Sequence, residues 1–141
     1  MTEIDNIIVK IRQGGSRVTK FRREIARIFV DRDCLLTPAQ ISKLLALKKI
    51  KADRTTLYRE LCFFVSRSII KKIQLADRNT YYEIANEHHH HLVCTKCNQI
   101  NKIVLDEHLE VQEKEILKKE NFKVQSHLLE FYGICSKCLK K

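Results

Sequence analysis

Cysteine side chains that could bind a metal ion stand in two pairs in this chain of 141 residues. Each pair has the spacing Cys-x-x-Cys, at Cys94 and Cys97 and again at Cys135 and Cys138. A structural zinc site takes four ligands in a tetrahedron, and two such pairs of thiolates commonly supply them. The four cysteines therefore predict a structural Zn²⁺ site that ties the end of the chain back to its middle.

Other chemistry is open to cysteine. Thioredoxin-like redox activity is the competing interpretation of Cys-x-x-Cys, and a duplicated motif beside a histidine run fits it poorly. Disulfides are disfavoured because the chain does not begin like a secreted protein. The two remaining cysteines, Cys34 and Cys62, fall in helical or helix-end contexts and are expected to be small core residues.

Four consecutive histidines, His88 to His91, precede the first cysteine pair. In an extended backbone side chains alternate between two faces, so His88 and His90 are expected on one face and His89 and His91 on the other. Neutral imidazole is a ligand for zinc, iron and manganese. One short segment could therefore supply ligands to two separate metal sites.

Each histidine pair needs further ligands. Glu110 and His127 are available to His88 and His90, and Glu83 is available to His89 and His91 on the side of the expected hinge. The alternative is that all four are surface histidines with weak, adventitious metal binding. Their position beside a four-cysteine set favours specific sites.

Positive charge is concentrated in the first part of the chain. The formal net charge is +10; residues 1–84 carry 18 lysines and arginines against 9 acidic residues, whereas residues 85–141 carry 9 against 8. A basic half indicates a polyanionic partner such as nucleic acid. A basic surface that serves only solubility is the alternative.

Helical patterns fill most of this basic part. Isoleucines at positions 4, 7, 8 and 11 follow helical spacing until Gly14 and Gly15. Thr19, Thr37 and Asp53 are candidate N-caps of three further helices. Residues 68–75 and 80–84 have the pattern of two strands around a turn. Helices followed by a hairpin predict a winged helix-turn-helix domain over residues 1–84, although other small α+β domains share this pattern.

The second part, residues 85–141, has a different pattern. Strands are expected at residues 92–93 and 100–105 around the first cysteine pair, a helix at 107–119, and a final strand at 122–132. The fold class predicted for the whole chain is α+β. The start of the chain is not a signal peptide and no apolar stretch approaches the ~20 residues of a membrane span, so a cytoplasmic protein without membrane contact is expected.

Several motifs together resemble the ferric uptake regulator family of metal-dependent repressors. The segment RVTKFRREI is similar to the family's helix opening VTxxR, with Phe21 where proline is usual, and RTTLYREL is similar to its recognition-helix signature T-V-Y-R. The stretches YYEI, HHHHLVCTKC and FKVQSHLLEFYGICSKC are similar to its metal-binding regions. The resemblance extends from about Gly15 to Cys138.

This resemblance implies a homodimer that binds double-stranded operator DNA when a regulatory metal is present, with a C-terminal α/β dimerisation domain over residues 85–141. It implies structural zinc on the four cysteines and a second divalent metal, Fe²⁺ or Zn²⁺, with Mn²⁺ possible. The implied ligand sets are His88, His90, Glu110 and His127 within the dimerisation domain, and Glu83, His89 and His91 at the hinge. The expected DNA-contacting residues are Arg17, Lys20, Arg22, Thr55, Thr56, Tyr58 and Arg59.

Some positions depart from the family pattern. The hinge site usually takes a histidine from the DNA-binding domain, yet no histidine precedes His88. A carboxylate usual after the first cysteine pair is replaced by Asn101 and Lys102. The hinge site is therefore expected to be incomplete or to recruit another ligand, the candidates being Asp31, Asp33, Cys34 and Asp77.

The function expected from the sequence is a metal-responsive transcriptional repressor and not an enzyme. A metal-trafficking or storage protein that does not bind DNA is the alternative, but it would not need the basic first part. A zinc hydrolase is a third class, but the chain has no HExxH-like arrangement of a catalytic carboxylate beside its candidate ligands.

Overall fold

The computed structural model describes every residue of the chain except 33, 86–87 and 106–108. The chain divides into two compact units, Met1–Asn86 and Glu87–Lys141, and each is described by itself. Asp33, a candidate hinge ligand, lies outside the described residues.

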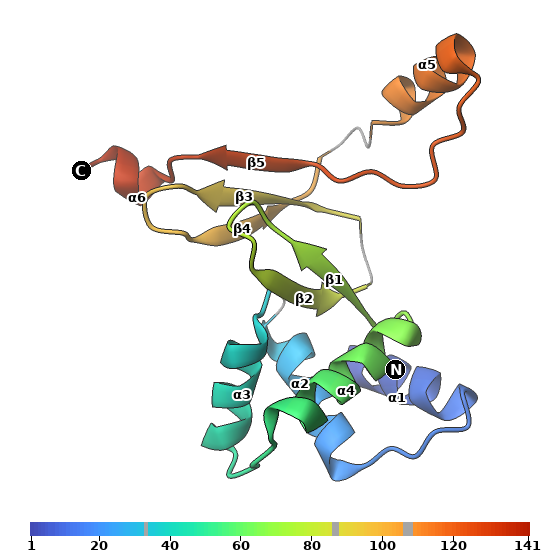
Figure 1. Cartoon of the computed structure of the whole chain (residues 1–141), viewed down its shortest axis with the longest axis vertical. Helices are drawn as coiled ribbons and strands as arrows, with labels where there is room; N and C mark the ends of the chain where they lie inside the picture. The colour runs from blue at the N-terminus through green and yellow to red at the C-terminus, as the bar shows by residue number, and fades with distance from the viewer. Residues whose placement is uncertain (33, 86–87, 106–108) are drawn as a thin grey trace. The chain divides into compact units, whose positions relative to one another are not determined.

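The first unit consists of four helices followed by a hairpin (Figure 1). In chain order these elements are α1 (Glu3–Gln13), α2 (Lys20–Arg32), α3 (Pro38–Leu47), α4 (Arg54–Ser66), β1 (Ile70–Gln74) and β2 (Thr80–Ile84). The two strands are antiparallel, with Ile70 opposite Ile84. The predicted winged helix-turn-helix fold is confirmed.

Side-chain caps fix where all four helices begin, with Thr2 at α1 and three expected caps at the others. The Thr19 Oγ accepts a hydrogen bond of 3.1 Å from the Arg22 N–H in the first turn of α2. Thr37 and Gln40 cap each other's backbone at the start of α3, and Asp53 accepts a hydrogen bond of 2.7 Å from the Thr56 N–H at the start of α4. Each cap satisfies an N–H that the helix itself cannot.

One apolar core joins the helices to the hairpin. Its fully buried side chains come from all four helices and from the start of β1, and include Ile11, Ile25, Phe29, Ile41, Leu45, Leu61, Phe64 and Ile70. A single-residue bridge between Leu36 and Tyr82, with backbone hydrogen bonds of 2.9 and 2.8 Å, adds the segment before α3 to the edge of β2. This bridge ties the hairpin to the helix-turn-helix.

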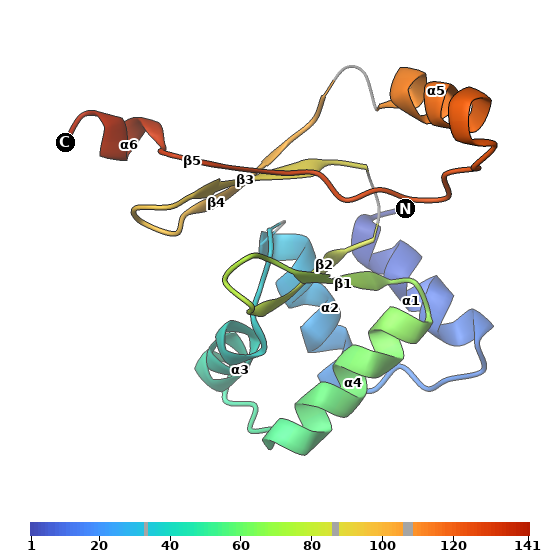
Figure 2. The same cartoon turned by 45° about the horizontal axis from the view of Figure 1, so that its top comes forward.

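The second unit is built on a three-stranded sheet. Its elements are β3 (His90–Cys94), β4 (Ile100–Ile103), α5 (Glu110–Glu120), β5 (Glu130–Gly133) and α6 (Ser136–Leu139). The strand order is β4-β3-β5; β4 is antiparallel to β3, and β5 is parallel to it. The helices α5 and α6 lie toward opposite ends of β5 (Figure 2). The sheet thereby brings residues 90–94 next to residues 130–133.

Three expectations need correction. The final strand covers only Glu130–Gly133, because residues 122–129 form no ladder with a neighbouring strand. The helix expected at 107–119 is α5, which begins at Glu110; residues 107 and 108 lie outside the described residues. Cys34 and Cys62 are exposed and not part of the core. Within the described ranges, no helix is both long and apolar enough to cross a membrane.

Candidate metal centres and nucleic-acid surface

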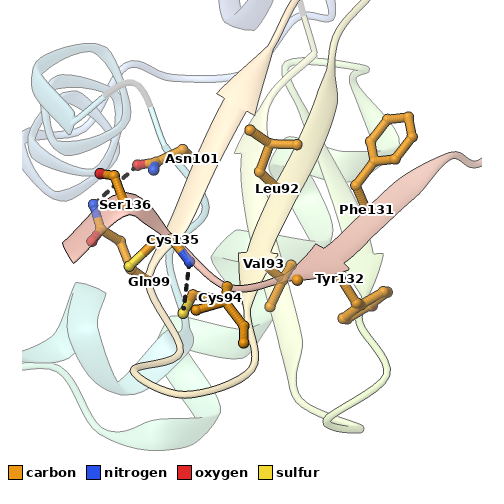
Figure 3. Close-up of a pocket in the computed structure, with 11 residues that line it drawn as sticks. Leu92, Val93, Cys94, Gln99, Asn101, Phe131, Tyr132, Cys135 and Ser136 are labelled. Carbon is orange, nitrogen blue, oxygen red and sulfur yellow. Dashed lines mark hydrogen bonds between the residues drawn. The ribbon is translucent and has the colours of Figure 1, made fainter. Parts of the chain in front are cut away.

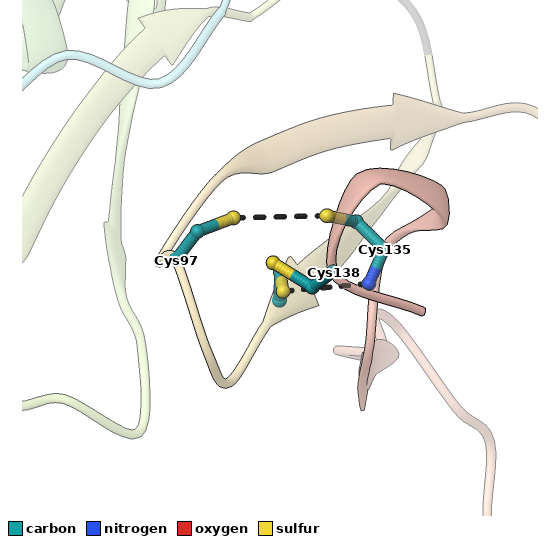
Figure 4. Close-up of side chains that lie close together, drawn as sticks. Cys97, Cys135 and Cys138 are labelled. Carbon is teal, nitrogen blue, oxygen red and sulfur yellow. Dashed lines mark hydrogen bonds between the residues drawn. The ribbon is translucent and has the colours of Figure 1, made fainter. Parts of the chain in front are cut away.

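The four paired cysteines converge at one end of the sheet of the second unit (Figure 4). Cys94 ends β3, Cys97 lies in the turn that follows, and Cys135 and Cys138 lie at the start and within α6. The sulfur atoms of Cys97 and Cys135 are 3.7 Å apart, and all four sulfurs lie within 4.8 Å of one another. The parallel pairing of β3 with β5 creates this arrangement, because it carries α6 to the end of β3.

This sulfur cluster fits a tetrahedral zinc ion. With Zn–S bonds of about 2.3 Å, the edge of a ZnS₄ tetrahedron is about 3.8 Å. A backbone hydrogen bond from the Cys135 N–H to the Cys94 Sγ is the largest cause that lowers the pKa of Cys94 to about 6. The neighbouring thiol of Cys135, followed by burial, raises the pKa of Cys138 to about 12. A divalent cation would stabilise the negative charge of these crowded thiolates. Metal binding would also release the protons that the thiols hold.

Three histidines form a second cluster in the same unit. The Nε2 atoms of His88 and His127 are 3.0 Å apart, and the ring of His88 lies 4.8 Å from that of His90 between centroids. One ring nitrogen from each of the three lies within 4.8 Å of the others. With metal–nitrogen bonds of 2.0–2.1 Å, neighbouring ligands are separated by about 3.0 to 3.4 Å. The geometry can therefore hold a divalent ion with imidazole ligands.

The acidic residue of α5 that contacts this cluster is Glu113, and not the expected Glu110. The Glu113 carboxylate lies 2.8 Å from His127 Nδ1, the nitrogen opposite the one that faces His88. A carboxylate on the second nitrogen orients a metal-binding imidazole. Glu110, the expected ligand, is exposed at the first residue of α5 and is outside the histidine group found among the described residues. Glu113 was missed, although it lies one helical turn after Glu110.

His89 and His91 form a separate ring pair, with centroids 5.0 Å apart. Thus the histidine run divides between two faces, as the alternation of an extended chain predicts. Glu83 belongs to β2 of the first unit, where its carboxylate lies 3.0 Å from the Lys71 amine. Asp77 accepts hydrogen bonds from the Tyr81 hydroxyl and the Asn79 N–H, and these interactions hold the pKa of Asp77 below its usual value. Asp77 is thus already engaged within its own turn.

The predicted DNA-contacting residues fall into two groups. Thr55, Thr56, Tyr58 and Arg59 are exposed on α4, and Leu57 and Leu61 on the same helix are buried in the core. Arg17, in the loop before α2, and Lys20, the first residue of α2, are exposed. Arg22 is different, because its guanidinium pairs with Glu60 at 2.8 Å and its side chain is only 18% exposed.

An apolar hollow of about 390 Å³ lies on the sheet of the second unit (Figure 3). Its lining includes Leu92, Val93, Phe131, Tyr132 and Ile134. Leu92 and Phe131 remain 37% and 42% exposed. Exposed apolar side chains gathered on one sheet indicate a surface that a protein partner covers.

Comparisons with known proteins agree over nearly the whole chain. The model of the Ferric uptake regulator family matches residues 13–132. The Ferric uptake regulation protein of Campylobacter jejuni is 30% identical over 137 residues, covering 91% of this chain and 83% of that protein. The Peroxide-responsive repressor PerR of Staphylococcus epidermidis is 28% identical over 138 residues, covering 96% and 90%. The Helicobacter pylori ferric uptake regulator Fur, described as having three functional metal binding sites, superposes with a TM-score of 0.81 at 25% identity, covering 99% and 93%.

Proposed function

Since this chain belongs to the ferric uptake regulator family of metal-responsive transcriptional repressors, we propose that it binds operator DNA as a homodimer when a regulatory metal site is filled. The observation that carries this proposal is the division of one histidine run between two groups of rings. The run follows β2 of the winged helix within a few residues. A regulator needs its metal site to be linked to its DNA-binding unit, and this short connection provides the link.

The winged-helix unit supplies the DNA-binding surface. The exposed residues of α4 can enter the major groove, where tyrosine and threonine contact base edges and arginine contacts bases or phosphates. Arg17 and Lys20 add positive charge just before and at the start of α2. The net positive charge of residues 1–84 supports backbone binding that depends on salt.

The cofactors are a structural zinc ion and a second divalent metal, iron, zinc or manganese. We assign the four cysteines to structural zinc, supported by sulfur spacing that matches a ZnS₄ tetrahedron. The second cluster is His88, His90 and His127, oriented by Glu113. Glu110 would join it through a shift in the first turn of α5.

The regulatory site at the hinge is assigned to Glu83, His89 and His91. These residues lie on both sides of the connection at residues 86–87. A ligand that prefers one relative orientation of the two units shifts the population toward that orientation, and only in proportion to its differential affinity. Binding at these side chains would therefore favour the orientation in which two α4 helices of a dimer meet two operator half-sites.

A second copy of the chain is the partner assigned to the apolar sheet surface of the second unit. Most stable homodimer interfaces are more apolar than the rest of the surface, and Leu92, Phe131, Tyr132 and Ile134 offer such a surface. A regulatory and not a catalytic role is supported by the relatives, which are transcription regulators.

Electrophoretic mobility shift with and without metal tests the proposed function. The probe is a duplex that the protein itself selects from a random-sequence library in the presence of Zn²⁺, Mn²⁺ or Fe²⁺. We expect a retarded complex with at least one metal and its loss when that metal is removed by EDTA. Failure to select any sequence with all three metals would contradict the function, and would favour metal storage or trafficking.

A further inference from the structure

Two arginines from different elements reach one aromatic ring on α4. The guanidinium carbon of Arg22 lies 3.8 Å from the centroid of the Phe63 ring, and that of Arg67 lies 5.6 Å from it. Guanidinium groups near an aromatic face are attracted to it by its quadrupole. Phe63 is itself packed partly against the core, so the ring offers both arginines a fixed support.

Each of the three guanidinium nitrogens of Arg22 has a partner within the protein. Its Nε and one terminal nitrogen lie 2.8 and 3.4 Å from the two carboxylate oxygens of Glu60, and the other terminal nitrogen donates to the Arg17 carbonyl at 2.9 Å. The forked contact with a carboxylate is the geometry that arginine forms best. Arg22 thus joins the recognition helix to the loop that carries Arg17.

Arg67, at the end of α4, holds the other end of the same loop. One of its terminal nitrogens donates to the Gly14 carbonyl at 3.0 Å and to the Ser16 hydroxyl at 3.4 Å. A methyl group added at Gly14 would overlap this guanidinium, so alanine at this position requires Arg67 to move. The loop between α1 and α2 is therefore fastened to α4 at two points, Gly14 and Arg17.

We propose that Arg22, Glu60, Phe63 and Arg67 form a positioning clamp that fixes the loop at residues 14–17 against the recognition helix. The inference rests on the proposed function, and it names the residues that set the spacing of two DNA-contacting elements. One element presents Arg17, and the other presents Tyr58 and Arg59. A fixed spacing makes both elements match one operator at the same time, so the clamp determines sequence specificity.

This assignment changes the expected role of Arg22 from DNA contact to positioning residue. Its side chain and that of Glu60 are each 18% exposed, and the pair is neutral as a unit. An arginine whose charge is balanced by a carboxylate of the protein does not replace a counterion on a DNA phosphate. Arg22 should therefore contribute to specific binding without contributing to the salt dependence.

Glu60→Gln distinguishes the clamp from simple electrostatics. Removal of a negative charge beside the DNA surface should raise affinity for any duplex by Coulomb attraction alone. The clamp predicts the opposite for the selected duplex, a loss of about tenfold, because the forked pair is broken. Affinity for a random duplex of the same length should stay equal or rise. Glu120→Gln, at the exposed end of α5, is the control for loss of one negative charge.

Arg22→Gln and Gly14→Ala complete the test. Arg22→Gln should weaken binding to the selected duplex about tenfold with an unchanged slope of log affinity against log salt concentration, whereas loss of a phosphate contact lowers the slope by about one. The double variant Arg22→Gln/Glu60→Gln should lose no more than either single variant, because both remove one interaction. Gly14→Ala should displace Arg67. It should therefore lower the ratio of the affinity for the selected duplex to the affinity for a random duplex.

Fluorescence anisotropy at several salt concentrations, on full-length protein with metal, gives all these values. Thermal melts followed by circular dichroism fix a temperature at which each variant is folded. Wild-type affinity in Glu60→Gln, or a slope reduced by one in Arg22→Gln, would overturn the clamp while the proposed function stands. Absence of sequence preference in the wild-type protein would instead overturn the proposed function, and the clamp with it.

Discussion

His88 and His89 are neighbours in the sequence, but their rings belong to different groups of side chains. His88 meets His90 and His127, whereas His89 pairs with His91. This division follows from the extended backbone that leads into β3, and it assigns the two residues different tasks. One belongs to a site within the sheet unit, and the other to the site proposed for the hinge.

Single substitutions should separate these tasks. We expect His89→Ala to abolish metal-dependent operator binding. His88→Ala should mainly lower the melting temperature, by about 5 °C or more, because it removes a metal that stabilises the folded state by mass action. Metal content measured by mass spectrometry, together with operator affinity, shows whether the two histidines serve different metal sites. Loss of the same single metal in both variants would show that the run feeds one site.

Tyr58 and Arg59 stand next to each other on α4 but are expected to act differently on DNA. Arg59→Ala should weaken binding to every duplex and lower the salt slope by about one if the arginine contacts a phosphate. Tyr58→Ala should cost roughly 1–3 kcal/mol on the selected duplex and little on random DNA. Anisotropy titrations on both duplexes measure the difference. Equal losses on both duplexes for Tyr58→Ala would mean that Tyr58 does not contact bases.

At the scale of elements, the four cysteines join β3 and its turn to the short helix α6. A helix of four residues has little stability of its own, so the zinc site must hold it. We predict that Cys135→Ser loses zinc and the dimer together, as judged by metal analysis and sedimentation. A zinc-free variant that remains a folded dimer would contradict this link.

Glu24 links α2 to the end of α3. Its carboxylate contacts Lys48 at 3.0 Å and Arg27 at 2.6 Å, and its side chain is 11% exposed. The hydrogen bond from Lys48, followed by the charges of Lys48 and Arg27, lowers the pKa of Glu24. A lowered pKa in the folded state adds stability above the unfolded pKa of about 4.3, and this stability is lost as the pH falls through the folded value.

We therefore expect Glu24→Gln to lower the free energy of unfolding by about 1–3 kcal/mol at pH 7. The difference from wild type should shrink as the pH falls below about 4. Urea unfolding at a series of pH values measures it. A difference that stays constant from pH 7 to pH 3 would rule out the ionised carboxylate as its cause.

The sequence predicted elements whose signals are local. Thr37 followed by Pro38, and Asp53 before α4, predicted helix starts correctly because a cap acts within four residues. Residues 122–125 alternate apolar and polar side chains like a strand, yet the strand that pairs with β3 is Glu130–Gly133. Alternation describes the side chains, but a strand also requires a partner that lies elsewhere in the sequence.

The same limit applies to the candidate sites. Arg22 is a basic residue in a segment predicted to contact DNA, and nothing near it in sequence indicates that Glu60, 38 residues away, lies within hydrogen-bond distance of its guanidinium. The burial expected for Cys34 and Cys62 was inferred only from the general tendency of cysteine to be buried. Both residues are exposed in the structure. The four-cysteine cluster needed no such long-range information, because its ligand types already define the chemistry.

For the molecule as a whole, the excess of positive charge lies in the first unit and most candidate metal ligands lie in the second, with Glu83 as the exception among the ligands. Residues 1–84 hold the excess of positive charge, and all histidines follow residue 87. We therefore expect a bound metal to change DNA affinity mainly through how the DNA-binding units are presented to the operator. Regulation of this kind requires that metal binding and DNA binding are thermodynamically coupled.

Thermodynamic linkage measures this coupling from both sides. If metal raises affinity for the selected duplex by a given factor, the duplex must raise affinity for the metal by the same factor. Isothermal titration of the regulatory metal into protein, with and without the selected duplex, measures the second factor, and anisotropy measures the first. We predict equal factors of at least about tenfold, and the loss of both in His89→Ala. Metal affinity that is the same with and without the duplex would contradict the account.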